Sequence, residues 1–164
     1  MSPDSITPRR ADGAVTVERV VPAPADRIFD LLAHPDRHAD LDGSGTVQGP
    51  RSAGRRVGLG DTFGMSMHWG VPYSTRNVVV EFEEGRRIAW RTLAPKPLHL
   101  LFTGRTWRYE LEPVEGGTLV RETWDPSTEA PLSRPLIKAR LSGMTKNNMR
   151  RTLDRLAEVV ASGT

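Results

Sequence analysis

The order of the expected secondary-structure elements constrains this chain most. Residues 15–21 have the β-branched composition of a strand, and residues 27–33 have the pattern of a short helix. A series of strands follows over residues 61–125, and the chain ends with an amphipathic helical pattern. The apolar face of that last helix must be buried, and one antiparallel sheet is the partner available. We therefore expect an α+β fold in which a curved sheet wraps a long C-terminal helix and leaves a ligand cavity between them.

The helical pattern at the end of the chain is carried by Leu141, Thr145, Met149, Leu153, Leu156 and Val160. The first helix is expected to start near Pro24 and Asp26, since proline and an acidic side chain both suit a helix N-terminus. It should end at His34, because the residue before a proline disfavours helical geometry. A short second helix over residues 36–41, a turn over 42–45 and a surface loop over 49–60 are expected next.

Five segments alternate between apolar and polar residues and are joined by short turns, which predicts an antiparallel sheet. They cover residues 61–69, 74–82, 87–93, 106–112 and 119–125. The two-residue period assigns these side chains to the inner face: Phe63, Met65, Met67; Val78, Val80, Phe82; Ile88, Trp90; Trp107, Tyr109, Leu111; Val120, Glu122 and Trp124. A β-bulge in any strand would reverse the assignment on one side of it.

Composition excludes several classes of function. The 164 residues include no cysteine, so disulfides, thiolate metal sites and cysteine nucleophiles are excluded. The net charge is +3, but the basic residues are scattered and form no nucleic-acid-binding motif. No apolar segment approaches the roughly 20 residues of a membrane span, and residues 1–13 lack the apolar core of a secretory signal. We expect a flexible leader over 1–13, a single domain over 14–164, and a cytoplasmic location.

Three parts of the chain carry a family resemblance. They are residues 21–29 (VPAPADRIF), the strand pair 107–111 (WRYEL) and 118–124 (TLVRETW), and residues 148–156 (NMRRTLDRL). Over residues 15–160 the chain resembles the START-like, or SRPBCC, superfamily with its helix-grip fold, and most closely the polyketide cyclase/dehydrase-like branch. The resemblance implies binding of a lipid, sterol, polyketide or other apolar molecule between sheet and helix. Some members of the superfamily are enzymes, so the resemblance leaves catalysis open.

Glu122 and Tyr109 are the candidate catalytic residues. If the alternation holds, the Glu122 carboxyl faces the cavity, where apolar surroundings raise a carboxyl pKa and suit it to general acid–base catalysis. The alternative is that Glu122 lies at the cavity rim or pairs with an arginine such as Arg105. Tyr109 either anchors the polar end of a ligand or is a core aromatic residue whose hydroxyl bonds to the backbone.

A polar cluster follows the first helix. It contains His34, Asp36, His38, Asp40 and Asp42. His34 and His38 have the spacing of two ligands on one helix, but Pro35 interrupts that helix and no third ligand is placed. We expect a solvated helix end beside the cavity mouth and no metal. The glycine pairs at 43–45 and 58–60 lack the strand-to-helix context of a nucleotide loop, so no cofactor is expected.

Three functions remain open from the sequence. The first is binding of a hydrophobic or amphipathic small molecule, either a lipid or a polyketide-like compound. The second is a polyketide cyclase or dehydratase that uses Glu122 as general acid or base, and the third is an accessory protein that docks a partner. The expected partner is a hydrophobic small molecule, without nucleic acid or membrane insertion, and the protein is expected to be a monomer or homodimer. The expected ligand-binding residues are Met65, Met67, Val80, Trp90, Trp107, Tyr109, Glu122, Trp124 and Met149.

Overall fold

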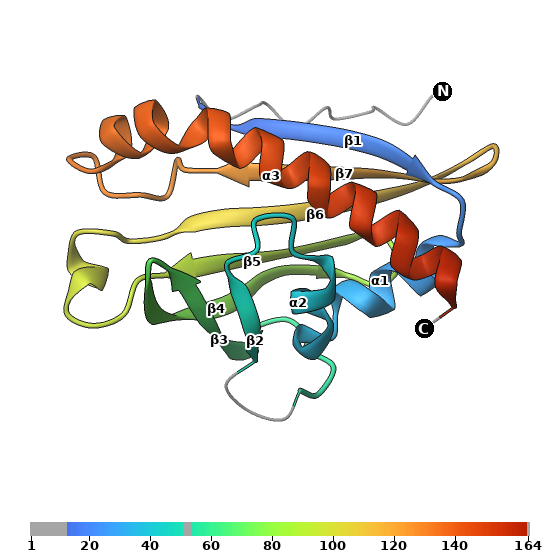
Figure 1. Ribbon diagram of the computed structural model, residues 1–164, viewed down its shortest axis with the longest axis horizontal. Coiled ribbons are helices and arrows are strands. Elements are labelled where there is room, and N and C mark those ends of the chain that lie inside the picture. Colours follow the sequence, from blue (N-terminus) through green and yellow to red (C-terminus); the bar gives the residue numbers. More distant parts are fainter. Residues whose placement is uncertain (1–12, 51–53, 164) are drawn as a thin grey trace, which may run out of the picture.

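A computed structural model describes residues 13–50 and 54–163 of the chain (Figure 1). It contains a seven-stranded antiparallel sheet with the strand order β1-β7-β6-β5-β4-β3-β2. Residues 1–12 of the expected leader lie outside the described residues. The strands are β1 (Val15–Val21), β2 (Val47–Pro50), β3 (Thr62–Trp69), β4 (Val71–Glu83), β5 (Arg87–Leu93), β6 (Arg105–Val114) and β7 (Gly117–Asp125).

Four helical segments lie on one side of this sheet (Figure 1): α1 (Ala25–Leu32), the 3-10 turn η1 (Pro35–Arg37), α2 (His38–Leu41) and the long α3 (Arg134–Ser162). A further 3-10 turn, η2 (Leu98–Leu100), belongs to the connection between β5 and β6. The α3 helix packs on β1 and β7 and also contacts α1 and α2. The expected α+β helix-grip fold, with short helices after the first strand and a sheet curled around the C-terminal helix, is confirmed.

The local signals around the first helix act as expected. Pro24 is the N-cap residue of α1, and the helix ends at Leu32, shortly before Pro35. The apolar side chains Ile28 and Phe29 are fully buried, so the amphipathic pattern turns this helix toward the core. The helix expected over residues 36–41 forms in two parts, as η1 followed by α2.

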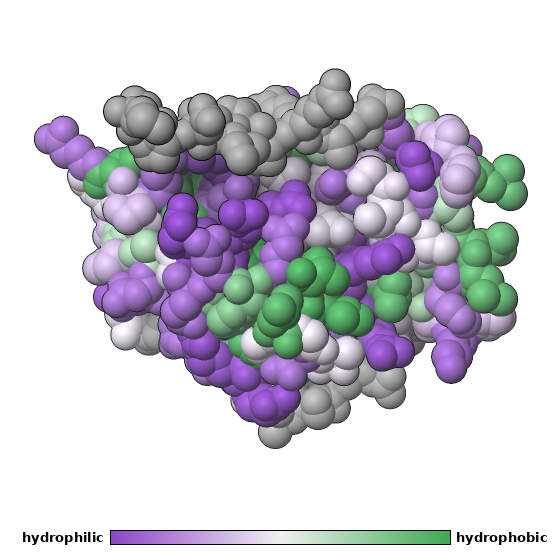
Figure 2. All heavy atoms as spheres, turned by 180° about the vertical axis from the view of Figure 1, so that it is seen from behind, coloured by the Kyte–Doolittle hydropathy of each residue, from purple (hydrophilic) through white to green (hydrophobic). Residues whose placement is uncertain are grey.

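The assignment of the inner face is wrong for the middle of β4. The register between β4 and β5 shifts between Val79 and Glu81, which marks a β-bulge. Because of this shift, Asn77 and Val79 are buried on the core side. Val78 and Val80, both assigned to the inner face, lie on the opposite face, and Val80 is 43% exposed. Beyond the bulge Phe82 returns to the core side. Figure 2 shows the outer face of the sheet, where hydrophilic side chains predominate and hydrophobic ones lie among them.

Two strand boundaries also differ from expectation. The segment 49–60 was expected as a loop, but β2 extends to Pro50 and pairs with β3. The β4 strand begins at Val71, and Pro72 does not interrupt it. Proline is tolerated there because β5 pairs with β4 only from Arg76 onward, so the start of β4 is paired with β3 alone.

Most of the remaining inner-face residues are buried, and the half-buried Met67, Phe82 and Trp107 pack against the core. Ile88, Leu111 and Val120 form the base of the core, together with buried residues of β3 and the helices. The α3 helix turns one stripe inward, and its buried residues are Ile137, Thr145, Met149, Leu153, Leu156, Ala157 and Val160. Among residues 13–50 and 54–163, no helix combines the length and apolar composition that a membrane span needs.

Candidate functional site

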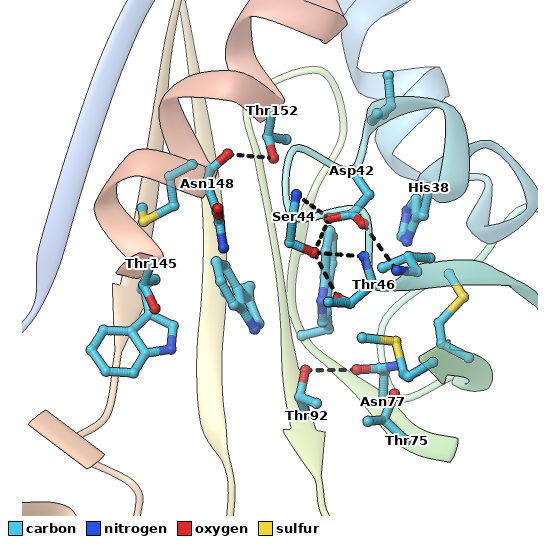
Figure 3. A pocket seen from close by; sticks show the side chains of 18 of the residues that line it. His38, Asp42, Ser44, Thr46, Thr75, Asn77, Thr92, Thr145, Asn148 and Thr152 are labelled. Atoms are coloured by element: carbon cyan, nitrogen blue, oxygen red, sulfur yellow. Dashed lines mark hydrogen bonds between the residues drawn. The ribbon is translucent and has the colours of Figure 1, made fainter. Parts of the chain in front are cut away.

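A cavity of about 540 Å³ lies between the inner face of the sheet, α3 and the α2–β2 segment (Figure 3). Its walls are largely apolar and aromatic, with side chains from Phe63, Met65, Trp90, Trp107 and Trp124 among them. Two further lining residues, Trp69 and Met144, are 65% and 46% exposed. The cavity therefore reaches the surface where the end of β3 faces the first half of α3.

The structure places every expected ligand-binding residue except Val80 around this cavity. The lining residues from the expected set are Met65, Met67, Trp90, Trp107, Tyr109, Glu122, Trp124 and Met149. Val80 lies on the other face of the sheet because of the bulge in β4, so its assignment to the cavity is wrong. That the other residues contact a ligand stays a prediction.

Tyr109 and Glu122 are brought together by the pairing of β6 with β7, in which they are directly opposed. The Tyr109 hydroxyl donates a hydrogen bond to Oε1 of Glu122 over 2.8 Å. Both residues are buried, with only 5% and 1% of their surface exposed. They form a buried, hydrogen-bonded polar pair in the wall of the cavity.

Burial raises the pKa of the Glu122 carboxyl to about 8 from an ordinary value of 4.5. The hydrogen bond from Tyr109 acts in the opposite direction, and the negative charge of Asp42 adds to the rise. Burial also raises the pKa of Tyr109 well above 10.0, with Glu122 contributing. At neutral pH the Glu122 carboxyl is therefore predominantly protonated, and Tyr109 keeps its proton.

The second carboxyl oxygen of Glu122 is unusual. Within the part of the chain that the structure describes, three buried side-chain atoms have no hydrogen-bond partner: Arg91 Nε, His99 Nδ1 and Glu122 Oε2. Of these three residues, only Glu122 lines the cavity. Arg105, considered from the sequence as its partner, instead lies 3.4 Å from the carboxylate of Glu129.

His38 contributes an aromatic stack to the cavity wall. Its ring stacks on Trp90 at a centroid distance of 4.9 Å, and Trp90 stacks on Tyr109 at 5.5 Å. Nε2 of His38 lies 2.8 Å from the carbonyl oxygen of Leu32. Burial lowers the pKa of His38, so the ring is neutral at pH 7 and Nε2–H donates to that carbonyl.

The sequence placed His38 at a solvated helix end beside the cavity mouth, whereas in the structure its ring is half-buried and lines the cavity. The available signal was the apolar Leu41, which lies three residues further along α2 and therefore on the same helix face. His34 and Asp40 do behave as surface residues: His34 Nδ1 bonds to the Asp30 carbonyl oxygen, and Asp40 pairs with Arg37. Among the described residues no group of three histidine or acidic side chains is placed to hold a metal ion.

Asp42 fixes the segment that closes one side of the cavity (Figure 3). Its Oδ1 accepts hydrogen bonds from the amide and the hydroxyl of Ser44, and its Oδ2 accepts one from the amide of Val47. The Ser44 hydroxyl lies 2.6 Å from that of Thr46. These bonds occupy the Asp42 carboxylate, so it has a structural role in the wall.

Further polar residues line the cavity and were missed by sequence reasoning. Asn77 accepts a hydrogen bond from Thr92 over 2.7 Å and donates one to the Phe63 carbonyl oxygen over 3.4 Å. The bulge in β4 hid Asn77, because unbroken alternation places it outside. Figure 3 shows Asn148 and Thr152 projecting from α3 on the other side. The cavity wall thus combines apolar and aromatic side chains with many polar ones, and such polar groups fix the orientation of a ligand in small-molecule sites.

Comparison with known proteins identifies the family. The family model described as "Polyketide cyclase / dehydrase and lipid transport" matches residues 12–161. An uncharacterized protein of Mycobacterium tuberculosis strain H37Rv is 31% identical over 156 residues, which cover 92% of this chain and 66% of that protein. This chain thus spans just under two thirds of that relative's length.

Solved structures agree on the fold. Protein MLL2253 from Mesorhizobium loti superposes with a TM-score of 0.69 at 16% identity, covering 92% of this chain and 98% of its own. The Aha1 dimer from Colwellia psychrerythraea gives a TM-score of 0.62 at 14% identity, covering 88% and 93%. At these identities the likeness concerns the fold alone. The match over residues 12–161 shows that the chain belongs to the polyketide cyclase/dehydrase and lipid transport family, within the START-like superfamily.

Proposed function

We propose that this protein binds a hydrophobic or amphipathic small molecule, lipid or polyketide-like, between its sheet and α3. The observation that carries the proposal is the cavity of about 540 Å³. Small-molecule sites commonly measure about 300–1,000 Å³, so the space suits one ligand of that size. Removing apolar ligand surface from water supplies the driving force for binding.

The chemistry of the walls supports the same proposal. Trp90, Trp107 and Trp124 offer large flat apolar surfaces, and Met65 and Met149 add side chains that adapt to irregular shapes. The exposed Trp69 and Met144 extend this apolar lining to the protein surface. A ligand that enters there meets continuous apolar surface between solvent and the interior.

The experiment is a binding screen with fatty acids, sterols and aromatic polyketides, read by displacement of an environment-sensitive apolar dye. Met67→Trp narrows the cavity, whereas Val80→Trp makes a comparable aliphatic-to-tryptophan change on the outer face of the sheet. Binding that is weakened by Met67→Trp and preserved in Val80→Trp supports the proposal. Failure of every compound to bind, or equal effects of the two variants, overturns it.

A second candidate function is proton transfer, as in a cyclase or dehydratase. It is favoured by the buried Glu122 carboxyl, whose pKa of about 8 lets it both give and take a proton near neutral pH. In this role Glu122 acts on an activated carbon or a leaving hydroxyl, and Tyr109 orients the reacting group. Glu122→Gln retains the shape and removes the proton. A turnover that falls roughly 10²–10⁴-fold while binding survives supports catalysis, and unchanged turnover excludes it for Glu122.

A further inference from the structure

The carboxyl oxygen Oε2 of Glu122 is a buried atom that lacks a hydrogen-bond partner among the described residues, on a residue that lines the cavity. It belongs to a side chain with 1% exposure. A buried polar atom without a partner costs roughly 1–3 kcal/mol, so native structures seldom keep one. Since Glu122 lines the cavity, a molecule bound there that packs against the carboxyl group supplies the missing bond.

The hydrogen bond that Oε1 of Glu122 accepts determines whether Oε2 can donate or accept a bond from a ligand. The Tyr109 hydroxyl donates to Oε1, so Oε1 serves as the acceptor of the carboxyl group. In the protonated form the proton then resides on Oε2, which becomes a hydrogen-bond donor. A donor needs an acceptor opposite it.

We propose that the ligand of this cavity places a neutral hydrogen-bond acceptor of the carbonyl type on Oε2 of Glu122. This inference rests on the proposed binding function and names the chemical class of the ligand's inner end. A ketone, ester or amide oxygen satisfies the donor without bringing a charge into the apolar wall. A carboxylate brings a charge that must lose its hydration there, which is unfavourable.

Charge around the site bears on how the inference is tested. The titratable and charged groups that line the cavity, besides Glu122, are His38, Asp42, Tyr73, Arg105, Tyr109 and Arg151. On the neighbouring strand β1, the residue opposite Glu122 is the apolar Val17. A Glu122→Gln variant keeps all of these groups, so any pH dependence that they cause persists in it. The difference between wild type and Glu122→Gln therefore reports on Glu122 alone.

The test uses three matched probes in titration calorimetry: benzophenone, diphenylmethane and diphenylacetate. Benzophenone carries one carbonyl where diphenylmethane carries a methylene group, and diphenylacetate adds a carboxylate. Below neutral pH we expect benzophenone to bind roughly fivefold more tightly than diphenylmethane, the worth of one net hydrogen bond. Diphenylacetate is expected to bind most weakly. Above about pH 8 the preference for benzophenone should disappear, because Glu122 loses the proton that it donates.

Two variants separate the hydrogen bond that Glu122 donates from the packing of its side chain. In Glu122→Gln the side-chain amide replaces the carboxyl donor, so the preference for benzophenone should persist at all pH values. In Glu122→Leu the donor is gone, and benzophenone should lose its advantage over diphenylmethane. If the leucine variant does not fold, the pH comparison between wild type and Glu122→Gln decides the matter by itself.

Several outcomes overturn the inference. Equal binding of benzophenone and diphenylmethane means that Oε2 is satisfied in another way, for example by a trapped water. Tightest binding of diphenylacetate means that the cavity recognises an anion. If neither neutral probe binds, the inference fails, and the wider apolar panel decides separately whether the proposed function fails with it.

Discussion

Tyr109 and Glu122 face each other across the β6–β7 pair, and the phenol oxygen lies 2.8 Å from the carboxyl oxygen Oε1. The hydrogen bond favours the charged carboxylate, but burial outweighs it and the pKa of Glu122 rises to about 8. The folded protein therefore holds a proton that the unfolded chain has released at neutral pH. Folding is thereby linked to proton uptake.

The first prediction is that the free energy of unfolding falls as pH rises from about 5 to about 8. Below an ordinary carboxyl pKa of 4.5, both states hold the proton and this group adds no pH dependence. Between that value and about 8 only the native state holds it, so stability is lost by up to about 1.4 kcal/mol per pH unit. Above about 8 the loss levels off. Urea unfolding at a series of pH values measures this.

The matched variant for this prediction is Glu122→Gln, which cannot titrate. The free energy of unfolding of this variant should vary less over the same pH range. Any stability advantage of the wild type over the variant therefore shrinks or reverses as pH rises. Glu115→Gln, at an exposed turn position, should follow the wild-type profile. Parallel pH profiles for wild type and Glu122→Gln would show that Glu122 is ionised in the folded protein.

The position of this pair was within reach of sequence analysis. The β6–β7 turn is short, and Val114 pairs with Gly117 at its base. Once the turn is located, counting outward along both strands places Tyr109 opposite Glu122. Alternation then assigns both to the inner face, because nothing interrupts the ladder. The position of the turn and the two-residue alternation were sufficient to predict this part of the site.

The parts that sequence analysis missed depend on long-range packing. The bulge between Val79 and Glu81 lies in the pairing of β4 with β5, beyond the last residue of β4 that pairs with β3, and no local residue signals it. It reversed the faces of Asn77 and Val80. The position of His38 in the cavity wall follows from stacking on Trp90, which lies far away in the sequence. Oε2 of Glu122 likewise has no partner among the described residues because Arg105, the partner considered from the sequence, forms its ion pair with Glu129 instead.

The second prediction tests the bulge with two neighbouring valines. Val79 is 1% exposed and Val80 is 43% exposed. Val79→Ala should lower the free energy of unfolding by about 2 kcal/mol, through lost burial and a small cavity. Val80→Ala should cost less than about 1 kcal/mol, since little apolar surface returns to water. Chemical denaturation of the two variants gives the comparison, and a larger cost for Val80→Ala would place the bulge elsewhere.

The third prediction concerns the contact between the α2–β2 segment and α3. A Cβ atom at Gly43 would lie 2.3 Å from the Asn148 carbonyl oxygen and 2.5 Å from the Thr152 amide nitrogen. The Gly43 amide also donates to the Thr152 hydroxyl over 3.0 Å. Gly43→Ala must push this segment away from α3, and we expect a cost of about 1–3 kcal/mol. Thermal or urea unfolding measures it.

The control for that prediction is a second glycine-to-alanine change. At Gly143, inside α3, an added Cβ meets nothing within 4 Å. Because glycine is a poor helix former, Gly143→Ala should raise the free energy of unfolding by roughly 0.5–1 kcal/mol. Opposite signs for Gly43→Ala and Gly143→Ala are expected. Stabilisation by both changes would mean that α3 is not packed against Gly43.

The last prediction tests the phase of α3, on which the whole cavity depends. Leu156 is fully buried with 0% exposure, whereas Arg150 is exposed to solvent. Leu156→Ala should lower the free energy of unfolding by roughly 2–5 kcal/mol, the usual range for such truncations in a core. Arg150→Ala should change it by about 0.5 kcal/mol or less, as at ordinary surface positions. Both values come from urea unfolding under the same conditions. Equal costs would mean that α3 turns a different face to the sheet, and Met149 would then no longer line the cavity.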